Sequence, residues 1–380
     1  MMTRYYTLIA LLAFLLFTGA QPTQSQAGPQ VTLHPLACTL CETRIAPDGK
    51  TAAIFENRDI AGGEVTAPAQ IAITLIDIAS GKTLGRLTGQ TDFTSDAAFA
   101  PDCRWLVSLH SNGSLRLWEV KTRKLVWDRF VGAGAGRVAF SANGKTIVAS
   151  RSGLPNALWF MDRQSGAIHP ILTWRFETLA EFMQLVSNAQ GSIGLNFSAW
   201  ALSPDGKQAA VATASDEVWL FDVAEGTAAL ALAGSDQPGL FSIRQLGYTP
   251  DGESLYFSDN RTHSPRLWSL AAMTDTLPLA AEAGEDGAEP PPFDLYGLAL
   301  SPDGSSFAWV DQNEEAGERG LPQLLVAPVD DWSQPTHVID LPAHLRASPP
   351  VRVFWTPDGR VIAGGFVTFD GDNVLVVVEP

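Results

Sequence analysis

One short turn sequence occurs seven times along the chain, about 50 residues apart, and it restricts the possible folds more than any other feature. Its pattern is an apolar residue, a small residue, and then Pro-Asp-Gly or a close variant. Proline presets φ, Asp or Asn tolerates the next position, and Gly supplies the positive φ that closes a tight hairpin. The pattern therefore predicts a hairpin turn and not a catalytic loop. The copies begin at Ile45, Phe99, Phe140, Leu202, Tyr248, Leu300 and Trp355.

Apolar and aromatic segments surround each turn in the same order. In the fourth unit they cover residues 198–202, 208–213, 217–223 and 227–233. Four strands in about 50 residues make one propeller blade, and a single blade cannot bury both of its apolar faces alone. The repeat therefore predicts an all-β fold over residues 30–380, a seven-bladed β-propeller of four-stranded antiparallel blades.

The ring closure can also be predicted. The last unit provides strands before Pro357, at 361–368 and at 373–379, and its fourth strand is missing. Residues 30–36 alternate in hydropathy and precede the first turn. We expect them to supply the outer strand of the seventh blade, because closing the ring removes the exposed ends of the stack of blades.

With these repeats, the chain resembles the WD40-like bacterial β-propeller repeat proteins, a superfamily that includes TolB-type domains. The strand from Leu115 to Glu119 also resembles the Trp-Asp strand of WD40 repeats. The resemblance implies the propeller fold, whereas propellers have many functions. Where WD40 repeats place Gly-His, this chain has other pairs, which predicts that the buried histidine network of that family is absent. These pairs are Gly89-Gln90, Gly132-Ala133 and Gly234-Ser235.

The N-terminal residues have the pattern of a secretory signal peptide. Arg4 precedes an apolar run of about 11 residues, and small residues end at Ala20, with a second possible cleavage point at Ala27. The run is too short to span a bilayer. We expect residues 1–20 to be removed and the protein to be secreted or periplasmic, with no membrane insertion afterwards. A retained anchor is the alternative.

Charge and cysteine content exclude other classes. A net charge of -16 disfavours nucleic acid as a partner. Three cysteines cannot build a disulfide framework, but Cys38 and Cys41 are expected to form a local disulfide next to the closing strand, rather than a redox pair. Cys103 replaces the turn glycine of the second unit, so it should adopt positive φ and be exposed.

The long connections fall on one side of the predicted disc. Connections from the second to the third strand of a blade, and from the fourth strand to the next blade, are the long ones. Such insertions are typical of a binding side, although insertions also accumulate wherever they are tolerated. Residues 175–190 carry the periodicity of a helix, which we expect to pack on the propeller or to dock a partner.

This side is predicted to be acidic, which favours a protein or envelope partner with a cationic surface. Residues 311–319 are expected to form one of its loops, and His263 is the only histidine considered as a ligand contact. The candidate binding residues are Arg58, Asp59, Trp174, Arg175, Asp259, Arg261, His263, Asp311, Glu314, Glu315, Arg319, Asp370 and Asp372.

No recognisable catalytic motif is present, and the six histidines have no metal-ligand spacing. Asp370 and Asp372 belong to a hairpin turn rather than a calcium loop. We therefore expect no cofactor and no metal, and an interaction scaffold rather than an enzyme. The alternative is a propeller enzyme such as a metal-dependent lactonase-like hydrolase, which would need carboxylates from several blades to converge on the channel.

Overall fold

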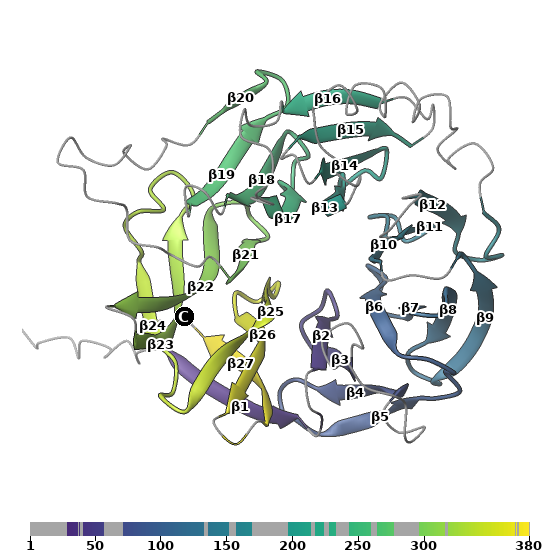
Figure 1. Ribbon diagram of the computed structural model, residues 1–380, viewed down its shortest axis with the longest axis horizontal. Coiled ribbons are helices and arrows are strands. Elements are labelled where there is room, and N and C mark those ends of the chain that lie inside the picture. The colour runs from purple at the N-terminus through teal and green to yellow at the C-terminus, as the bar shows by residue number, and fades with distance from the viewer. Residues whose placement is uncertain are drawn as a thin grey trace, which may run out of the picture.

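The computed structural model forms a closed ring of seven β-sheets (Figure 1), as the turn repeat predicts. It describes residues 29–36, 38, 41–56, 71–132, 136–151, 157–168, 197–213, 217–223, 228–232, 243–259, 264–276, 296–315, 318–368, 370 and 372–379. The predicted signal peptide at 1–20 and the predicted helix at 175–190 lie outside the described residues. No helix long and apolar enough to cross a membrane is found among the residues described.

Blades 1 to 4 follow one another along the chain. Blade 1 contains β2 (Cys41–Ile45), β3 (Thr51–Glu56), β4 (Ile73–Asp77) and β5 (Thr83–Leu87). Blade 2 contains β6 (Thr94–Phe99), β7 (Trp105–His110), β8 (Ser114–Glu119) and β9 (Lys124–Phe130). The described part of blade 3 contains β10 (Val138–Phe140), β11 (Thr146–Arg151) and β12 (Ala157–Asp162). Blade 4 contains β13 (Phe197–Leu202), β14 (Gln208–Thr213), β15 (Val218–Asp222) and β16 (Ala228–Leu232).

Blades 5 to 7 complete the ring. Blade 5 contains β17 (Ile243–Tyr248), β18 (Ser254–Asp259), β19 (Ser264–Ser269) and β20 (Thr274–Asp275). Blade 6 contains β21 (Tyr296–Leu300), β22 (Ser306–Glu315), β23 (Glu318–Pro328) and β24 (His337–Asp340). Blade 7 contains β25 (Leu345–Trp355), β26 (Val361–Thr368), β27 (Asn373–Glu379) and, as its outer strand, β1 (Gln30–Leu36).

The predicted closure is confirmed. β1 pairs antiparallel with β27 from Gln30 opposite Glu379 to Leu36 opposite Asn373. Figure 1 shows the purple N-terminal strand beside the yellow C-terminal one. Leu36 is buried, and Val31 and Leu33 pack against the core of blades 6 and 7. The strand therefore adds apolar contacts as well as backbone hydrogen bonds.

The recurring turns have the expected geometry. In the first, Gly49 has φ 67° and its N–H donates to the carbonyl of Ala46 at 2.8 Å. The Asp48 carboxylate accepts a hydrogen bond from the N–H of Lys50 at 3.0 Å. Every turn of this kind connects the first and second strands of a blade, so all seven lie on one side of the disc.

Hydrophobic clusters join each blade to the next. One cluster packs Phe55 and Leu75 of blade 1 against Leu106 and Trp118 of blade 2. Another packs Ile54 of blade 1 against blade 7 and closes the ring. There is one cluster for each of the seven blade interfaces. Each blade thus buries both of its faces against its neighbours, which a single blade could not do.

Candidate functional site

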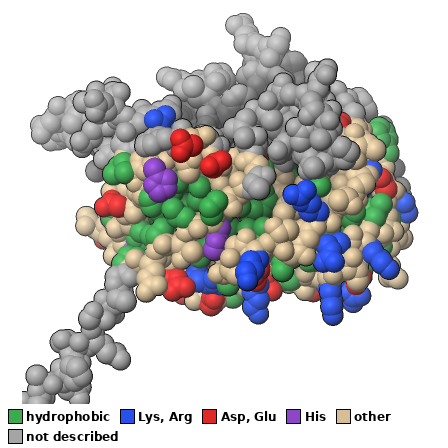
Figure 2. Space-filling view, turned by 90° about the horizontal axis from the view of Figure 1, so that it is seen from below, with side chains coloured by type: hydrophobic (Ala, Val, Ile, Leu, Met, Phe, Trp, Pro, Cys, Tyr) green, Lys and Arg blue, Asp and Glu red, His purple; other side chains and the backbone are tan. Residues whose placement is uncertain are grey.

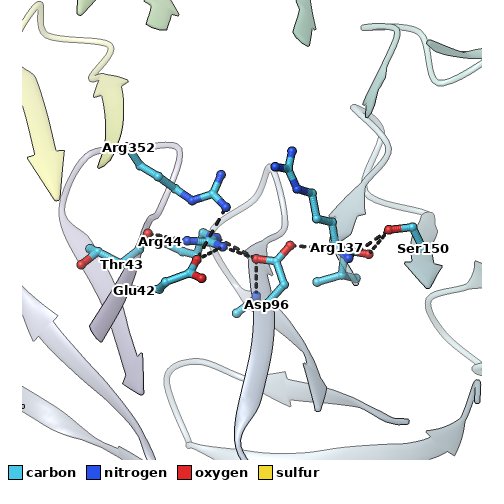
Figure 3. Close-up of polar contacts among 9 residues, drawn as sticks. Glu42, Thr43, Arg44, Asp96, Arg137, Ser150 and Arg352 are labelled. Atoms are coloured by element: carbon cyan, nitrogen blue, oxygen red, sulfur yellow. Dashed lines mark hydrogen bonds and ion pairs between the residues drawn. The ribbon is translucent and has the colours of Figure 1, made fainter. Parts of the chain in front are cut away.

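A group of charged side chains comes together on the innermost strands of four successive blades (Figure 3). β2 supplies Glu42 and Arg44, β6 supplies Asp96, and β25 supplies Arg352. Arg137 directly precedes β10. In Figure 1 these strands surround one side of the centre of the ring. We call these five residues the channel cluster.

Arg44 is the centre of the cluster. Its Nη2 lies 2.5 Å from Oε2 of Glu42 and 2.5 Å from Oδ1 of Asp96, while its Nε donates to the same Asp96 oxygen at 2.8 Å. Both carboxylate side chains are only 6% exposed. The guanidinium also lies 5.4 Å from the ring centroid of the buried Phe55. Burial alone would lower the pKa of Arg44, but the negative charges of Asp96 and Glu42 have the larger combined effect and raise it.

The other two arginines are less well neutralised. Nη2 of Arg352 lies 3.5 Å from Oε2 of Glu42, the oxygen that Arg44 already binds, and its Nε is buried without a hydrogen-bond partner. Burial and the neighbouring Arg44 and Arg137 lower the pKa of Arg352 to about 10. Burial, followed by Arg44, lowers the pKa of Arg137. Both arginines remain protonated at neutral pH.

Four members of the cluster occupy the same place in their blades. Glu42, Asp96, Arg137 and Arg352 each lie three residues before the last residue of the innermost strand. The same place holds Ala199, Gln245 and Gly297 in blades 4, 5 and 6. The register of the turn repeat therefore brings these positions to one level of the ring.

At this place, an acceptor side chain links neighbouring blades. Oδ2 of Asp96 accepts a hydrogen bond from the backbone N–H of Val138 in blade 3 at 2.9 Å. Gln245 accepts in the same way from the N–H of Leu298 in blade 6. Arginine has no acceptor atom, so Arg137 and Arg352 cannot make this structural contact.

Blade 2 contains a buried histidine network, so the expectation that such a network is absent was wrong for this blade. Nε1 of Trp118 donates to Oγ of Ser108 at 2.9 Å, and this oxygen lies 3.0 Å from Nε2 of His110. The histidine comes from the end of β7, whereas Gln90, at the usual family position, donates to the carbonyl of Leu87. Burial, followed by the charge of Arg116, lowers the pKa of His110 to about 4. The network is structural, since the histidine is 1% exposed.

The structure does not bring the predicted binding residues together into one described site. Asp370 and Asp372 are exposed in the hairpin turn between β26 and β27, where the N–H of Asp372 donates to Oγ1 of Thr368 at 3.1 Å. Asp259 ends β18. Six of the candidates lie outside the described residues: Arg58, Asp59, Trp174, Arg175, Arg261 and His263.

The expected loop at 311–319 is largely a β-hairpin. β22 continues to Glu315 and β23 begins at Glu318, with Glu314 opposite Arg319. Its charge pattern indicated a loop, but two antiparallel strands can extend their backbone ladder whatever the side chains. Asp311 is only 3% exposed, so it is poorly placed to contact a partner.

The cysteines divide into a pair and a single thiol. Cys38 and Cys41 form a disulfide between β1 and β2, with Cα atoms 6.1 Å apart. Cys103 adopts φ 56°, as its place in the turn predicts. It is only partly exposed, however, because its side chain packs against the core between blades 1 and 2. Burial raises the pKa of its thiol.

Sequence reasoning missed the whole channel cluster. The available signal was charge inside short apolar strands, as in Glu42 and Arg44 of β2, and Asp96 of β6. Alignment of the strands that precede the seven turns would have placed four of the five residues at one level.

The chemistry of the cluster is that of ion pairing. Glu42 and Asp96 do converge from two blades, but Arg44 binds both of them. Among the residues that the structure describes, no three His, Cys, Asp or Glu side chains form a group that could hold a metal. The groups of the cluster that could still bind an anion are the guanidinium N–H donors of Arg137 and Arg352.

Comparison with known proteins agrees with this fold. Residues 81–119, which contain the Trp118 network, match the family described as WD domain, G-beta repeat. The chain is similar to the β-propeller domain of Cps50 (Swd1) from Myceliophteria thermophila, with a TM-score of 0.59, 12% identity, and coverage of 91% of this chain and 99% of that domain. No curated protein matches the sequence. The chain is a seven-bladed propeller, and the segment from β5 to β8 is similar to a WD40 repeat.

Proposed function

We propose that this WD40-type propeller is an interaction scaffold that binds a protein or envelope component through one side of its disc. The fold itself carries the proposal, because WD40 propellers generally bind proteins. β1 completes the seventh blade and so closes the ring, which presents the loops of all seven blades on a common platform for a partner.

The binding side that we propose is the one opposite the recurring turns. On the turn side, the connections are short and Lys and Arg side chains gather, as along the lower edge of the disc in Figure 2. Exposed Lys50 and Arg104 belong to the recurring turns, and exposed Lys82 lies in the turn between β4 and β5 on the same side. The opposite side carries Asp370, Asp372 and the tip of the hairpin at Glu314 and Glu315. Its acidic residues favour a partner with a cationic surface.

A charge-reversal experiment tests the binding side. The mature protein, bearing a photo-crosslinker on the hairpin tip, is compared with a Glu314→Lys, Glu315→Lys variant in capture from envelope and secreted fractions. The matched control, Glu253→Lys with Asp331→Lys, makes the same charge change on the turn side. We expect the tip variant to lose a partner that the wild type and the control both retain. Equal capture by all three proteins would refute the acidic binding side.

We also propose that the protein is exported, on the basis of its N-terminal sequence. Mass spectrometry of the protein from a secreting host should find a mature chain that begins at Gln21 or Gly28. Recovery of the intact N-terminus from the cytoplasmic fraction would contradict export, whatever the outcome of the capture experiment.

A further inference from the structure

We propose that the channel cluster binds a single carboxylate group between Arg137 and Arg352. This site goes beyond the scaffold function, because it uses the innermost strands of the ring rather than its loops. Figure 3 shows the two arginines on either side of the Glu42, Arg44 and Asp96 group, with their guanidinium ends turned toward the space between them.

The first argument is the charge balance of the cluster. Three guanidinium groups face two carboxylates, so one positive charge is left over. Arg44 takes the close contacts with both Glu42 and Asp96, at 2.5 Å. Arg352 has only a shared contact of 3.5 Å, and the Arg137 side chain makes no hydrogen bond or ion pair with the part of the chain that the structure describes. The excess charge is therefore shared by Arg137 and Arg352.

The second argument is that neither arginine can make the hydrogen bond that joins neighbouring blades at this place. At the same place in the blade, Asp96 and Gln245 accept a hydrogen bond from the next blade, which an arginine cannot do. Blades 4 and 6 have Ala199 and Gly297 there, so the blade geometry does not demand a long side chain. The two cations repel each other, since, in addition to burial, Arg137 lowers the pKa of Arg352, and their incomplete compensation costs free energy that a bound anion would offset.

The third argument concerns the identity of the anion. A guanidinium offers a planar fork of donors that matches the two oxygens of a carboxylate. The buried Nε of Arg352 lacks a partner, and 34% of its side chain is exposed, so solvent reaches the residue. A carboxylate carries one negative charge and would balance the surplus, whereas a phosphate would exceed it.

Calorimetric titration of the full mature chain with acetate tests the site, with acetamide as the uncharged isostere and sodium chloride to hold ionic strength constant. Wild type should bind acetate, and Arg137→Gln with Arg352→Gln should lower the affinity at least tenfold. Arg104→Gln is the matched control, because Arg104 is an exposed turn arginine paired with Glu119 at 3.1 Å. It should bind as wild type does.

Two further arms make the result decisive. Inorganic phosphate should bind more weakly than acetate, and a triglycine peptide should bind better than its C-terminal amide. If the Gln variant does not fold, Arg137→Lys with Arg352→Lys keeps both charges but loses the forks, and should weaken acetate binding. Equal binding of acetate and acetamide, tighter binding of phosphate, or undiminished acetate binding by the folded variants would overturn the proposal.

Discussion

Nη2 of Arg44 in blade 1 lies 2.5 Å from Oδ1 of Asp96 in blade 2, so an ion pair joins two neighbouring blades at the innermost strands. The same guanidinium holds Glu42. Asp96 continues the chain of contacts, because its other oxygen accepts from the N–H of Val138 in blade 3. One arginine thus supports the packing of three blades.

Replacement of Arg44 by Met should destabilise the protein by about 3 to 5 kcal/mol, because it removes the closest ion-pair partner of two buried carboxylates, Glu42 and Asp96. Urea unfolding measures the change. Further substitution of Glu42→Gln and Asp96→Asn should recover part of the loss. Arg104→Met, which removes an exposed pair with Glu119, should cost less than about 1 kcal/mol. If both substitutions lowered the free energy of unfolding by the same amount, burial of the Arg44 ion pairs would not make them more stabilising than an exposed pair.

Acidification should destabilise the protein partly through His110. Its pKa is about 4 in the folded protein, against an ordinary value of 6.5, because the ring is buried. The unfolded chain therefore binds the proton first as the pH falls, and this contribution to the free energy of unfolding is lost between about pH 6.5 and 4. The full loss is on the order of 3 kcal/mol.

Urea unfolding at several pH values in this window measures the effect, with His110→Gln and the exposed His344→Gln compared with wild type. The stability of the His110 variant should depend less on pH than that of the other two proteins. Identical pH profiles for all three proteins would contradict a buried neutral histidine.

Cys103→Gly should give a more stable protein than Cys103→Ala, by about 1 kcal/mol, because both remove the thiol but only glycine adopts φ 56° without strain. Thermal unfolding measures the difference. Gly304→Ala is the reverse test: φ there is 74°, and the added Cβ would meet only ordinary contacts with Pro250. Gly304→Ala should destabilise the protein by a similar amount. If the two Cys103 variants were equally stable, the positive φ at this position would cause no strain.

Deletion of residues 30–36 should lower the melting temperature by ~5–10 °C or more, since it removes β1 and exposes the edge of β27. A peptide of residues 29–36, added in excess, should restore part of the loss by pairing with β27. A scrambled peptide should not. An unchanged melt after deletion would show that the ring does not depend on its closing strand.

The sequence predicts this fold because the residues that define each blade, those of its turn, are neighbours in the sequence. The turn at Gly49 needs a residue that accepts positive φ, and similar residues recur in each unit, so the blades can be counted. The missing outer strand follows from that count. The hairpin at Glu314 was wrongly predicted as a loop because its charges obscured a backbone ladder that does not depend on them.

The channel cluster could not be predicted in the same way. Arg352 and Glu42 lie at opposite ends of the sequence, and only ring closure brings them together. Their proximity also requires a common register of the innermost strands, which no local pattern specifies. For the candidates at Arg58, Trp174 and His263, the predictions stand as expectations.

The antiparallel register of β1 and β27 also determines how the ring would respond to a pulling force. Gln30 lies opposite Glu379, so a force applied to both chain ends acts at the same end of the two strands. The backbone bonds between them would break one after another, as in a zipper, instead of sharing the load as they do in shear. We therefore expect the seventh blade to open first under tension, although the same strand pairing closes the ring at rest.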